Sequence, residues 1–391
     1  MSAPVRAGPD SAGVVRVGII GAGRWVAQHH LPSLLEHPSA AVTAIAEPNE
    51  GRRRLAQEQF GIAAAYETAE ELCASGLVDA VVVASPPVAH YEGAGIAIDA
   101  GLGVLVEKPM TLESVHAWDL VRRAEAAGVP LVVSYPFNFT RAVDHARRLV
   151  EAGRIGDVQL TTALFATPRT HLYRPTGTAA EEDAAAAATL AVPDRRTFAD
   201  PAVAGGGQGQ TEVTHALANV LQISGLRARS VAAVMHRHDC AVDLVDGFVI
   251  EWEGGAIGSL GATGGVPPDV TPQRDFGYFG TEGVLRQDLT GGSVRLLAAG
   301  GVTDTFLEDE ERYPAGAPAS CLVELMAGSE RNPAPGALGA RVVECLEAAY
   351  RSAREGGGPV VVGPAVAPAT GDGEGCTAGG SHSPVDGALH R

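Results

Sequence analysis

The chain of 391 residues is too long for a single ordinary core, and this length predicts two domains with a cleft between them. Its 29 Lys and Arg residues stand against 46 Asp and Glu residues, which gives a net charge of −17. No dense basic block offsets this charge, so neither nucleic acid nor an anionic membrane is expected as a partner. The composition favours a small-molecule partner.

The five cysteines do not indicate a disulfide framework or a zinc site. Their number is odd, they are widely spaced, and no two form a Cys-x-x-Cys pair. His236 and His238 have the spacing of metal ligands, but no second cluster supplies the others, so no metal is expected. Residues 1–13 lack the apolar core of a signal peptide, and no later run reaches the roughly 18 apolar residues of a membrane span. These features favour a cytoplasmic protein.

From residue 14 onward, short β-branched runs alternate with helical segments, which predicts a doubly wound parallel sheet with helices on both faces. The expected strands are Val14–Ile20, Ala41–Ala46, Val78–Ala84 and Val104–Val106. The expected helices are Arg24–Leu35, Asn49–Phe60, Val88–Ala100 and Leu112–Ala127. Gly61, Gly101 and Gly128 follow three of these helices, and Thr68-x-x-Glu71 makes a capping box for another. This Rossmann-type domain is expected over residues 14–134.

Beyond residue 134 the pattern predicts an α+β domain over residues 135–362. Helices are expected at Asp144–Ala152, Glu212–Ile223 and Leu338–Arg354. Strand-like runs joined by glycine pairs predict a large, mostly antiparallel sheet, and they are Val158–Phe165, Ser230–Met235, Phe248–Glu253, Ala256–Leu260, Phe276–Phe279 and Val294–Leu297. Residues 1–13, 176–192 and 363–391 are expected outside either core, the first and last as disordered tails, because they bury too little apolar surface.

A glycine-rich turn, Gly21-Ala22-Gly23, follows the first expected strand. Gly21 allows a tight turn and Gly23 lets the backbone approach a pyrophosphate, which the positive end of the next helix attracts. Arg24 and Trp25 begin that helix and are further candidate cofactor contacts, whereas the third small position of the fingerprint holds Val26. The turn predicts dinucleotide binding, and an ordinary strand-to-helix turn is the alternative.

Glu47 ends the second expected strand, where a carboxylate accepts hydrogen bonds from the adenosine ribose diol of NAD. NAD is therefore the expected cofactor. NADP is the alternative, because the nearby run Arg52–Arg54 could hold a 2′-phosphate, although such a run is more often a solvated helix face.

Two further strands end in candidate site residues. Ser85 and Pro86 follow Val78–Ala84 and form a rigid loop suited to a flat nicotinamide ring, and His90 comes five residues later. The next strand ends in Glu107-Lys108-Pro109, so Lys108 is expected at the same edge as the glycine turn. Glu107 and Lys108 are further candidate cofactor contacts. A buried lysine ammonium with a lowered pKa can donate to a substrate oxygen, whereas an exposed salt bridge to Glu107 is the alternative.

In the second domain, Gly205-Gly206-Gly207 leads into a helix that carries His215 near its start. A single helical histidine is usually structural. Its ordinary pKa near 6.5 nevertheless suits general acid and base chemistry at neutral pH.

Taken in order, these four motifs resemble the glucose-fructose oxidoreductase / inositol dehydrogenase / rhizopine-catabolism (Gfo/Idh/MocA) family over roughly residues 15–362. The resemblance implies a Rossmann domain followed by a domain whose open sheet supports a homo-oligomer, a dimer or a tetramer. It also implies NAD(P)-dependent oxidation or reduction of sugars and cyclitols. Lys108 takes the place of the motif lysine, and His215 that of the histidine in an Asp-x-x-x-His motif.

The same resemblance names candidate substrate contacts. Thr211 stands where the family motif has its aspartate, and a hydroxyl cannot serve as a base at neutral pH. Tyr135 and Asn138 lie where the chain passes between domains, and Gln208 has a polar tip suited to sugar hydroxyls. Lys108 and His215 complete the expected substrate site.

The expected function is hydride transfer between a nicotinamide cofactor and a secondary alcohol, or the matching ketone, of a sugar, cyclitol or related polyol. In the oxidation direction His215 accepts the hydroxyl proton and Lys108 stabilises the developing alkoxide. One alternative is a regulator that binds dinucleotide and sugar without catalysis. Another is an enzyme that cleaves glycosides by transient oxidation.

Overall fold

The computed structural model describes residues 13–174 and 189–363. The N-terminal lobe is built on a parallel sheet in the order β3-β2-β1-β4-β5-β6. Its strands are β1 (Val15–Ile20), β2 (Ala40–Ala46), β3 (Ala64–Tyr66), β4 (Ala80–Val83), β5 (Gly103–Val106) and β6 (Leu131–Val133). β4 and β5 are buried along their whole length, as expected for strands covered on both faces. The strand order reverses at β1, between β2 and β4.

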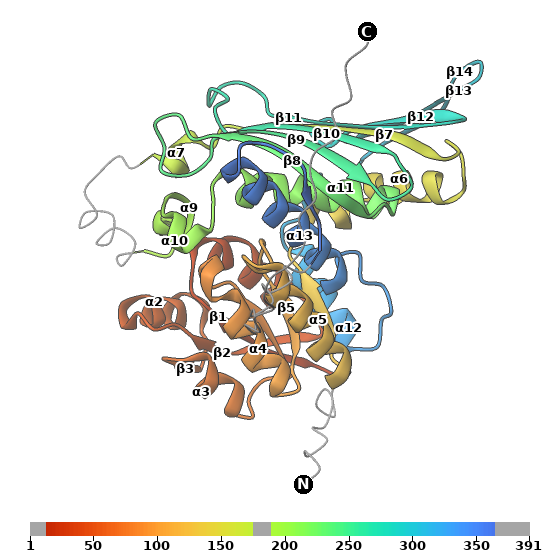
Figure 1. Cartoon of the computed structure of the whole chain (residues 1–391). Coiled ribbons are helices and arrows are strands. Elements are labelled where there is room, and N and C mark those ends of the chain that lie inside the picture. Colours follow the sequence, from red (N-terminus) through yellow and green to blue (C-terminus); the bar gives the residue numbers. More distant parts are fainter. Residues whose placement is uncertain (1–12, 175–188, 364–391) are drawn as a thin grey trace, which may run out of the picture.

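Helices on both faces of this sheet complete the predicted doubly wound lobe (Figure 1). They are η1 (Val26–His30), α1 (Leu31–Glu36), α2 (Glu50–Phe60), α3 (Ala69–Ala74), η2 (Pro87–Ala89), α4 (His90–Asp99) and α5 (Ser114–Ala127). Left-handed glycines end α2 at Gly61 and α5 at Gly128, and Thr68 and Glu71 form the predicted capping box of α3. η1 is a π-helical turn, which the 3.6-residue periodicity could not predict.

The second lobe carries a nine-stranded sheet in the order β14-β13-β12-β11-β7-β10-β9-β8-β15. Only the β7–β10 pair is parallel within this sheet, so the prediction of a mostly antiparallel sheet is confirmed. The strands are β7 (Val158–Ala166), β8 (Ala228–His236), β9 (Val245–Trp252), β10 (Ile257–Thr263), β11 (Gln273–Gly280), β12 (Gly283–Asp288), β13 (Ser293–Ala298), β14 (Gly301–Leu307) and β15 (Val360–Val361). β12 and β14 were not expected from the sequence.

Helices cover one face of this sheet and leave the other open (Figure 1). They are η3 (Pro136–Phe139), α6 (Arg141–Glu151), η4 (Gly209–Val213), α11 (Thr214–Ser224) and α13 (Gly336–Arg354). α7 (Thr170–Tyr173), α9 (Arg196–Ala199) and α10 (Pro201–Ala204) lie at one edge, beside the N-terminal lobe. None of the helices in residues 13–174 and 189–363 combines the length and the apolar character that crossing a membrane requires.

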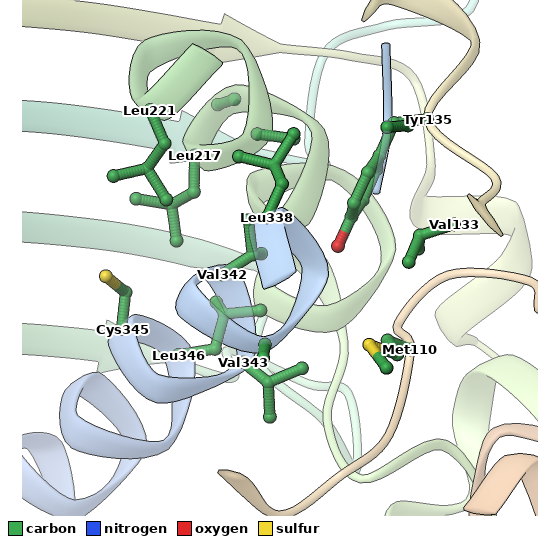
Figure 2. Packing of buried hydrophobic residues seen from close by; sticks show 14 of the residues in the cluster. Met110, Val133, Tyr135, Leu217, Leu221, Leu338, Val342, Val343, Cys345 and Leu346 are labelled. Atoms are coloured by element: carbon green, nitrogen blue, oxygen red, sulfur yellow. The ribbon is translucent and has the colours of Figure 1, made fainter. Parts of the chain in front are cut away.

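One continuous core joins the two lobes. Figure 2 shows Leu217 and Leu221 of α11 beside Val342 and Leu346 of α13, with Met110 from the loop after β5 nearby. All of these side chains are at most 7% exposed and belong to a single apolar cluster that includes strands of both sheets. Large buried apolar surface stabilises the relative position of the lobes. Residues from the two lobes can therefore form one rigid site between them.

Two features of the chain path depart from expectation. α12 (Ala317–Met326) comes late in the sequence yet contacts β5 and β6 of the N-terminal sheet. Leu190, expected outside either core, is 3% exposed and packs in the N-terminal apolar cluster. Apolar contact rather than local composition decides its place. The two expected tails otherwise lie outside the described residues, and the domain boundary at residues 134 and 135 stays a prediction.

Candidate active site

A cavity of about 780 Å³ opens at the carboxyl ends of β1, β2 and β4. This is the edge at which the strand order reverses, where open parallel sheets bind ligands. α9 and the loop before it contribute to the wall that faces the second lobe. The lining includes seven predicted cofactor contacts, which are Gly21, Gly23, Arg24, Trp25, Glu47, Ser85 and Pro86.

The turn after β1 forms an open backbone cradle in this cavity. Gly21 has a φ of 98°, and a Cβ there would come within 2.8 Å of the backbone of Ala84 and Ser85, so only glycine fits. A Cβ at Gly23 would meet only the Ala84 carbonyl oxygen, at 4.0 Å. The helix that begins at Arg24 leaves its first N–H groups without acceptors inside the helix. Such a cradle fits the pyrophosphate of a dinucleotide.

Glu47 lies at the end of β2 and lines the cavity, although it is only 8% exposed. Its Oε2 accepts the Ala22 N–H at 2.8 Å and its Oε1 accepts the Asn49 N–H at 3.0 Å. These bonds fix the carboxylate and leave lone pairs for ligand hydroxyls. Arg52, expected on a solvated helix face, is instead buried against the cavity, where its Nη2 donates to the Ala22 carbonyl at 2.8 Å.

We expect NAD(H) to bind more tightly than NADP(H), because the Glu47 carboxylate accepts ribose hydroxyls and repels a 2′-phosphate. Titrating each cofactor against tryptophan fluorescence measures both affinities. Glu47→Gln removes the negative charge and should reduce the ratio of the NADP(H) dissociation constant to the NAD(H) dissociation constant by about tenfold or more. The exposed Glu50→Gln is the matched control. Tighter binding of NADP(H) to the unaltered protein would discard the role of Glu47 and point to Arg52.

His90 is absent from the cavity lining, and its predicted contact with the cofactor stays a prediction. It is 1% exposed, with Nε2 2.8 Å from the Ser85 carbonyl and Nδ1 2.7 Å from the Pro109 carbonyl. Burial lowers the pKa of His90, and these two carbonyls oppose that effect. His90 therefore ties the loop after β4 to the loop after β5. The Ser85 hydroxyl is buried with no partner in the described residues, which leaves it for a ligand.

Glu107 is buried at the end of β5. Its Oε1 lies 2.7 Å from Nε2 of His30, and its Oε2 accepts the Lys108 N–H at 3.1 Å. Burial by itself raises the pKa of Glu107, but the hydrogen bond and charge of His30 and the charge of Lys108 lower it overall. The ionised carboxylate thus orients the backbone that presents Lys108. Glu107 is absent from the cavity lining, and a direct contact with the cofactor stays a prediction.

Lys108 extends from the loop after β5 into the second lobe, where its Nζ donates to the Thr211 carbonyl at 3.0 Å. Burial lowers the pKa of Lys108, and the charges of Glu212 and Glu107 partly oppose this effect. Lys108 is also the single lysine of the chain, and the other residues in the count of Lys and Arg are all arginines. This sequence signal fits a position that needs a compact ammonium with an adjustable pKa.

His215 lies one helical turn after Thr211, so the Lys108 hydrogen bond brings the two expected catalytic residues together. The imidazole is 4% exposed, and its Nδ1 is buried without a partner in the described residues. Burial lowers the pKa of His215 well below its ordinary value, and the positive charges of Lys108, Arg274 and Arg169 add to this effect. His215 is therefore neutral at neutral pH and able to accept a proton.

Close packing at two glycines and hydrogen bonds to a buried carboxylate position the helix that carries Thr211 and His215. A Cβ at Gly206 would come within 2.0 Å of the Tyr350 hydroxyl, and one at Gly207 would come within 2.1 Å of the Asp243 carbonyl. Asp243 accepts the N–H groups of Gly207 and Gly209 at 2.8 and 2.7 Å and the Tyr350 hydroxyl at 2.9 Å. The glycines thus allow the close approach that positions η4 and α11.

Several charged residues around His215 were not predicted from the sequence. Arg169, just after β7, donates from Nε to Oε1 of the buried Glu212 at 2.6 Å. Arg274, near the start of β11, places its guanidinium 5.6 Å from the Phe137 ring centre and 5.2 Å from that of Phe165. These residues come from separate elements, so no local spacing indicates that they meet.

Tyr313 connects this charged group to the cavity. Its ring centre lies 6.2 Å from that of Trp25, which lines the cavity, and 6.1 Å from that of His215. It also lies 4.6 Å from the ring centre of Phe137. The Trp25 Nε1 is buried without a partner in the described residues. A chain of packed rings therefore links the lining of the dinucleotide cavity to His215.

Three of the predicted substrate contacts make hydrogen bonds within the protein. Tyr135 is fully buried, and its hydroxyl lies 3.3 Å from Thr214 Oγ1, while Gln208 is fully buried and accepts the Tyr173 hydroxyl at 3.1 Å. The backbone carbonyl of Thr211 accepts the hydrogen bond from Lys108, and the Thr211 hydroxyl makes a hydrogen bond with Tyr173. Tyr135 and Gln208 expose no polar atom to solvent, and their contact with a substrate stays a prediction. Asn138 is 1% exposed with both amide atoms unpartnered in the described residues, and its role stays a prediction.

Comparison with known proteins agrees with this geometry. Residues 15–135 match the model of an oxidoreductase family with an NAD-binding Rossmann fold, Gfo/Idh/MocA. This part of the chain therefore matches the family that its motifs resemble, and it is an NAD-binding Rossmann domain. Within the described residues, no three His, Cys, Asp or Glu side chains gather as a metal ion would require.

Two relatives match less than half of the chain. The dTDP-3,4-didehydro-2,6-dideoxy-alpha-D-glucose 3-reductase of Streptomyces violaceoruber is 33% identical over 159 residues, 41% of this chain and 46% of that protein. Inositol 2-dehydrogenase of Corynebacterium glutamicum is 32% identical over 156 residues, 39% of this chain and 46% of that protein. The chain thus spans less than half the length of these curated relatives.

The fold itself extends over nearly the whole chain. An inositol dehydrogenase homolog from Azotobacter vinelandii, solved with NADH and myo-inositol, superposes with a TM-score of 0.73 at 18% identity. The superposition covers 90% of this chain and 98% of that one. The arrangement of a Rossmann lobe beside a large open sheet is therefore shared.

Proposed function

We propose that this protein is an NAD-dependent oxidoreductase that interconverts a secondary alcohol and a ketone of a sugar, cyclitol or related polyol. The observation that carries the proposal is the hydrogen bond of Lys108 Nζ to the turn preceding His215, beside a cavity built for a dinucleotide. An ammonium and a neutral imidazole at one end of such a cavity suit the removal of a hydroxyl proton.

Each residue has a distinct role in the oxidation direction. The neutral imidazole of His215 accepts the hydroxyl proton, and the Lys108 ammonium stabilises the developing alkoxide. Glu107 holds the Lys108 backbone, while Glu212 contributes a negative charge that favours the charged ammonium. Bound NAD supplies the hydride acceptor for the carbinol carbon. The Thr211 carbonyl fixes the ammonium in place without taking up a proton.

The substrate class is supported by the relatives, whose names include an inositol dehydrogenase and a deoxysugar reductase. A screen at 340 nm of sugars, inositols and other polyols, with NAD and NADP in parallel, tests the proposal. We expect NAD-linked turnover of at least one polyol. Binding of NAD without turnover on any member would favour a regulator, and released glycoside fragments seen by thin-layer analysis would favour glycoside cleavage.

We further propose that the chain forms a homo-oligomer through the open face of the nine-stranded sheet (Figure 1). Leu164, Val249 and Ile257 are exposed on β7, β9 and β10, three adjacent strands of that sheet. Exposed apolar side chains on neighbouring strands favour association. The number of subunits stays a prediction.

A further inference from the structure

More positive charges surround His215 than the binding and oxidation of a neutral polyol require. Three cations act on His215, which are Lys108, Arg169 and Arg274. Of the carboxylates near them, Glu212 is already paired with Arg169, and Glu107 is held by His30 and a backbone N–H. Partly buried charge without a partner costs free energy, and proteins usually match it with an opposite charge. An anionic group on the substrate would supply that charge.

Arg274 is the cation that makes no ion pair with another side chain of the described residues. Its only hydrogen bond among the described residues is a long one, 3.4 Å from Nη1 to Thr290 Oγ1, and its Nε is buried with no acceptor. Within the same part of the chain no carboxylate lies within ion-pair distance of it. Burial lowers the pKa of Arg274 and the charge of Arg169 adds to this effect, whereas Glu212, Tyr313 and Asp288 oppose it from beyond ion-pair distance. Most of the five N–H donors of this guanidinium are therefore free to bind a ligand.

The position of Arg274 is fixed by the sheet. It pairs with Phe165 across β11 and β7, and it shares a face with Phe276 and Tyr278, which are buried beneath the helices. The rings of Phe137 and Phe165 lie against the guanidinium. Phe137 in turn contacts His215, with ring centres 5.7 Å apart. A rigid, stacked guanidinium thus stands one aromatic ring from the proposed proton acceptor, the arrangement that suits bidentate binding of a planar carboxylate.

We propose that Arg274 binds a carboxylate of the substrate, so that the protein oxidises a polyol acid, such as a uronic acid, an aldonic acid or a carboxylated cyclitol. This inference rests on the proposed function above. A monoanion fits because Glu212 matches Arg169 and Lys108 is needed by the alkoxide, which leaves one unmatched positive charge. During the reaction the carbinol hydride passes to NAD⁺ and the hydroxyl proton passes to His215, giving ketone, NADH and a proton, while the carboxylate is unchanged.

Matched substrate pairs test the proposal on the unaltered protein. Glucuronate is compared with glucose, gluconate with glucitol, and quinate with myo-inositol, and glucose 6-phosphate serves as a phosphate-bearing probe. We expect kcat/KM for at least one acid to exceed that of its neutral partner by about 100-fold or more. Equal or better turnover of the neutral partners would overturn the inference and leave the proposed function intact, and preference for the phosphate would overturn the carboxylate assignment. Failure of every compound would instead count against the proposed function.

A variant pair separates binding from folding. Arg274→Met should raise KM for the preferred acid by about 100-fold. Arg274→Lys keeps the positive charge but lacks the planar guanidinium, so its KM should lie between those of Arg274→Met and the unaltered protein. Arg286→Met is the matched control, because Arg286 also lies over a phenylalanine ring, 4.7 Å from Phe279, but is exposed outside the site. Quenching of tryptophan fluorescence by the acid in the presence of NADH reports binding without turnover. An unchanged KM and unchanged quenching in a folded Arg274→Met protein would sink the proposal.

Discussion

Replacing Lys108 with Met is expected to lower turnover by about 10²-fold or more while NAD affinity stays nearly unchanged. The ammonium lies beyond the cavity lining and contacts the helix of His215, so its loss removes stabilisation of the alkoxide rather than of the dinucleotide. Lys108→Arg should restore little activity, because a planar guanidinium cannot occupy the place of a compact ammonium. Initial rates and fluorescence titration of NAD measure the two effects, and full activity of Lys108→Met would refute the mechanism.

The single lysine allows its protonation to be measured directly. Reductive methylation with labelled formaldehyde gives one lysine signal in an NMR spectrum, apart from that of the terminal amine, because the chain has no other lysine. Burial lowers the pKa of Lys108, so this signal should titrate below the ordinary value of 10.5. The oxidation rate should also decline at alkaline pH as the ammonium loses its proton. Titration at the ordinary value would show that the ammonium is solvated.

Replacing His215 with Ala is expected to remove the acid limb of the pH profile and to lower the oxidation rate by about 10²- to 10⁴-fold. His215 must be neutral to accept a proton, and burial with three nearby cations lowers its pKa well below 6.5. The rate of the unaltered protein should therefore fall only at a pH clearly below 6.5, as a single group becomes protonated. Thr211 cannot serve as a second base there.

The role of His215 is tested by comparing the dependence of kcat/KM on pH for the unaltered protein and for His215→Ala. His215→Asn is a useful second variant, because it preserves part of the side-chain volume in this buried position and guards against loss of the fold. His116→Ala, at a partly exposed position of α5, is a control histidine replacement outside the site. Retention of the acid limb in both His215 variants would assign the proton transfer to another group.

The local elements of the N-terminal lobe follow from the sequence because they depend on neighbouring residues. Period-two and helical patterns, a capping box at Thr68 and glycines at helix ends act within a few positions of the chain. The turn at Gly21 and the loop carrying Lys108 likewise lie at the ends of strands whose order is set by right-handed crossovers. Their meeting at one edge of a parallel sheet could therefore be predicted from the motifs.

Only the tertiary structure decided which polar side chains face the site. His90, Tyr135 and Gln208 look suited to ligands in the sequence, but packing buries them and other groups of the protein bond their polar atoms. The Gln208 amide nitrogen, for example, donates a long hydrogen bond of 3.5 Å to Thr167 Oγ1. For Arg274 the reverse holds, because a charged residue in a strand is expected to face solvent. The pairing of β11 with β7 instead places it beside Phe165, on the face that the helices cover. Strand register over more than a hundred residues has no local signal, since it is fixed by burial of whole faces. The sequence by itself thus determined the dinucleotide turn and the Lys108 loop, and the packing of the two lobes determined the charge that surrounds them.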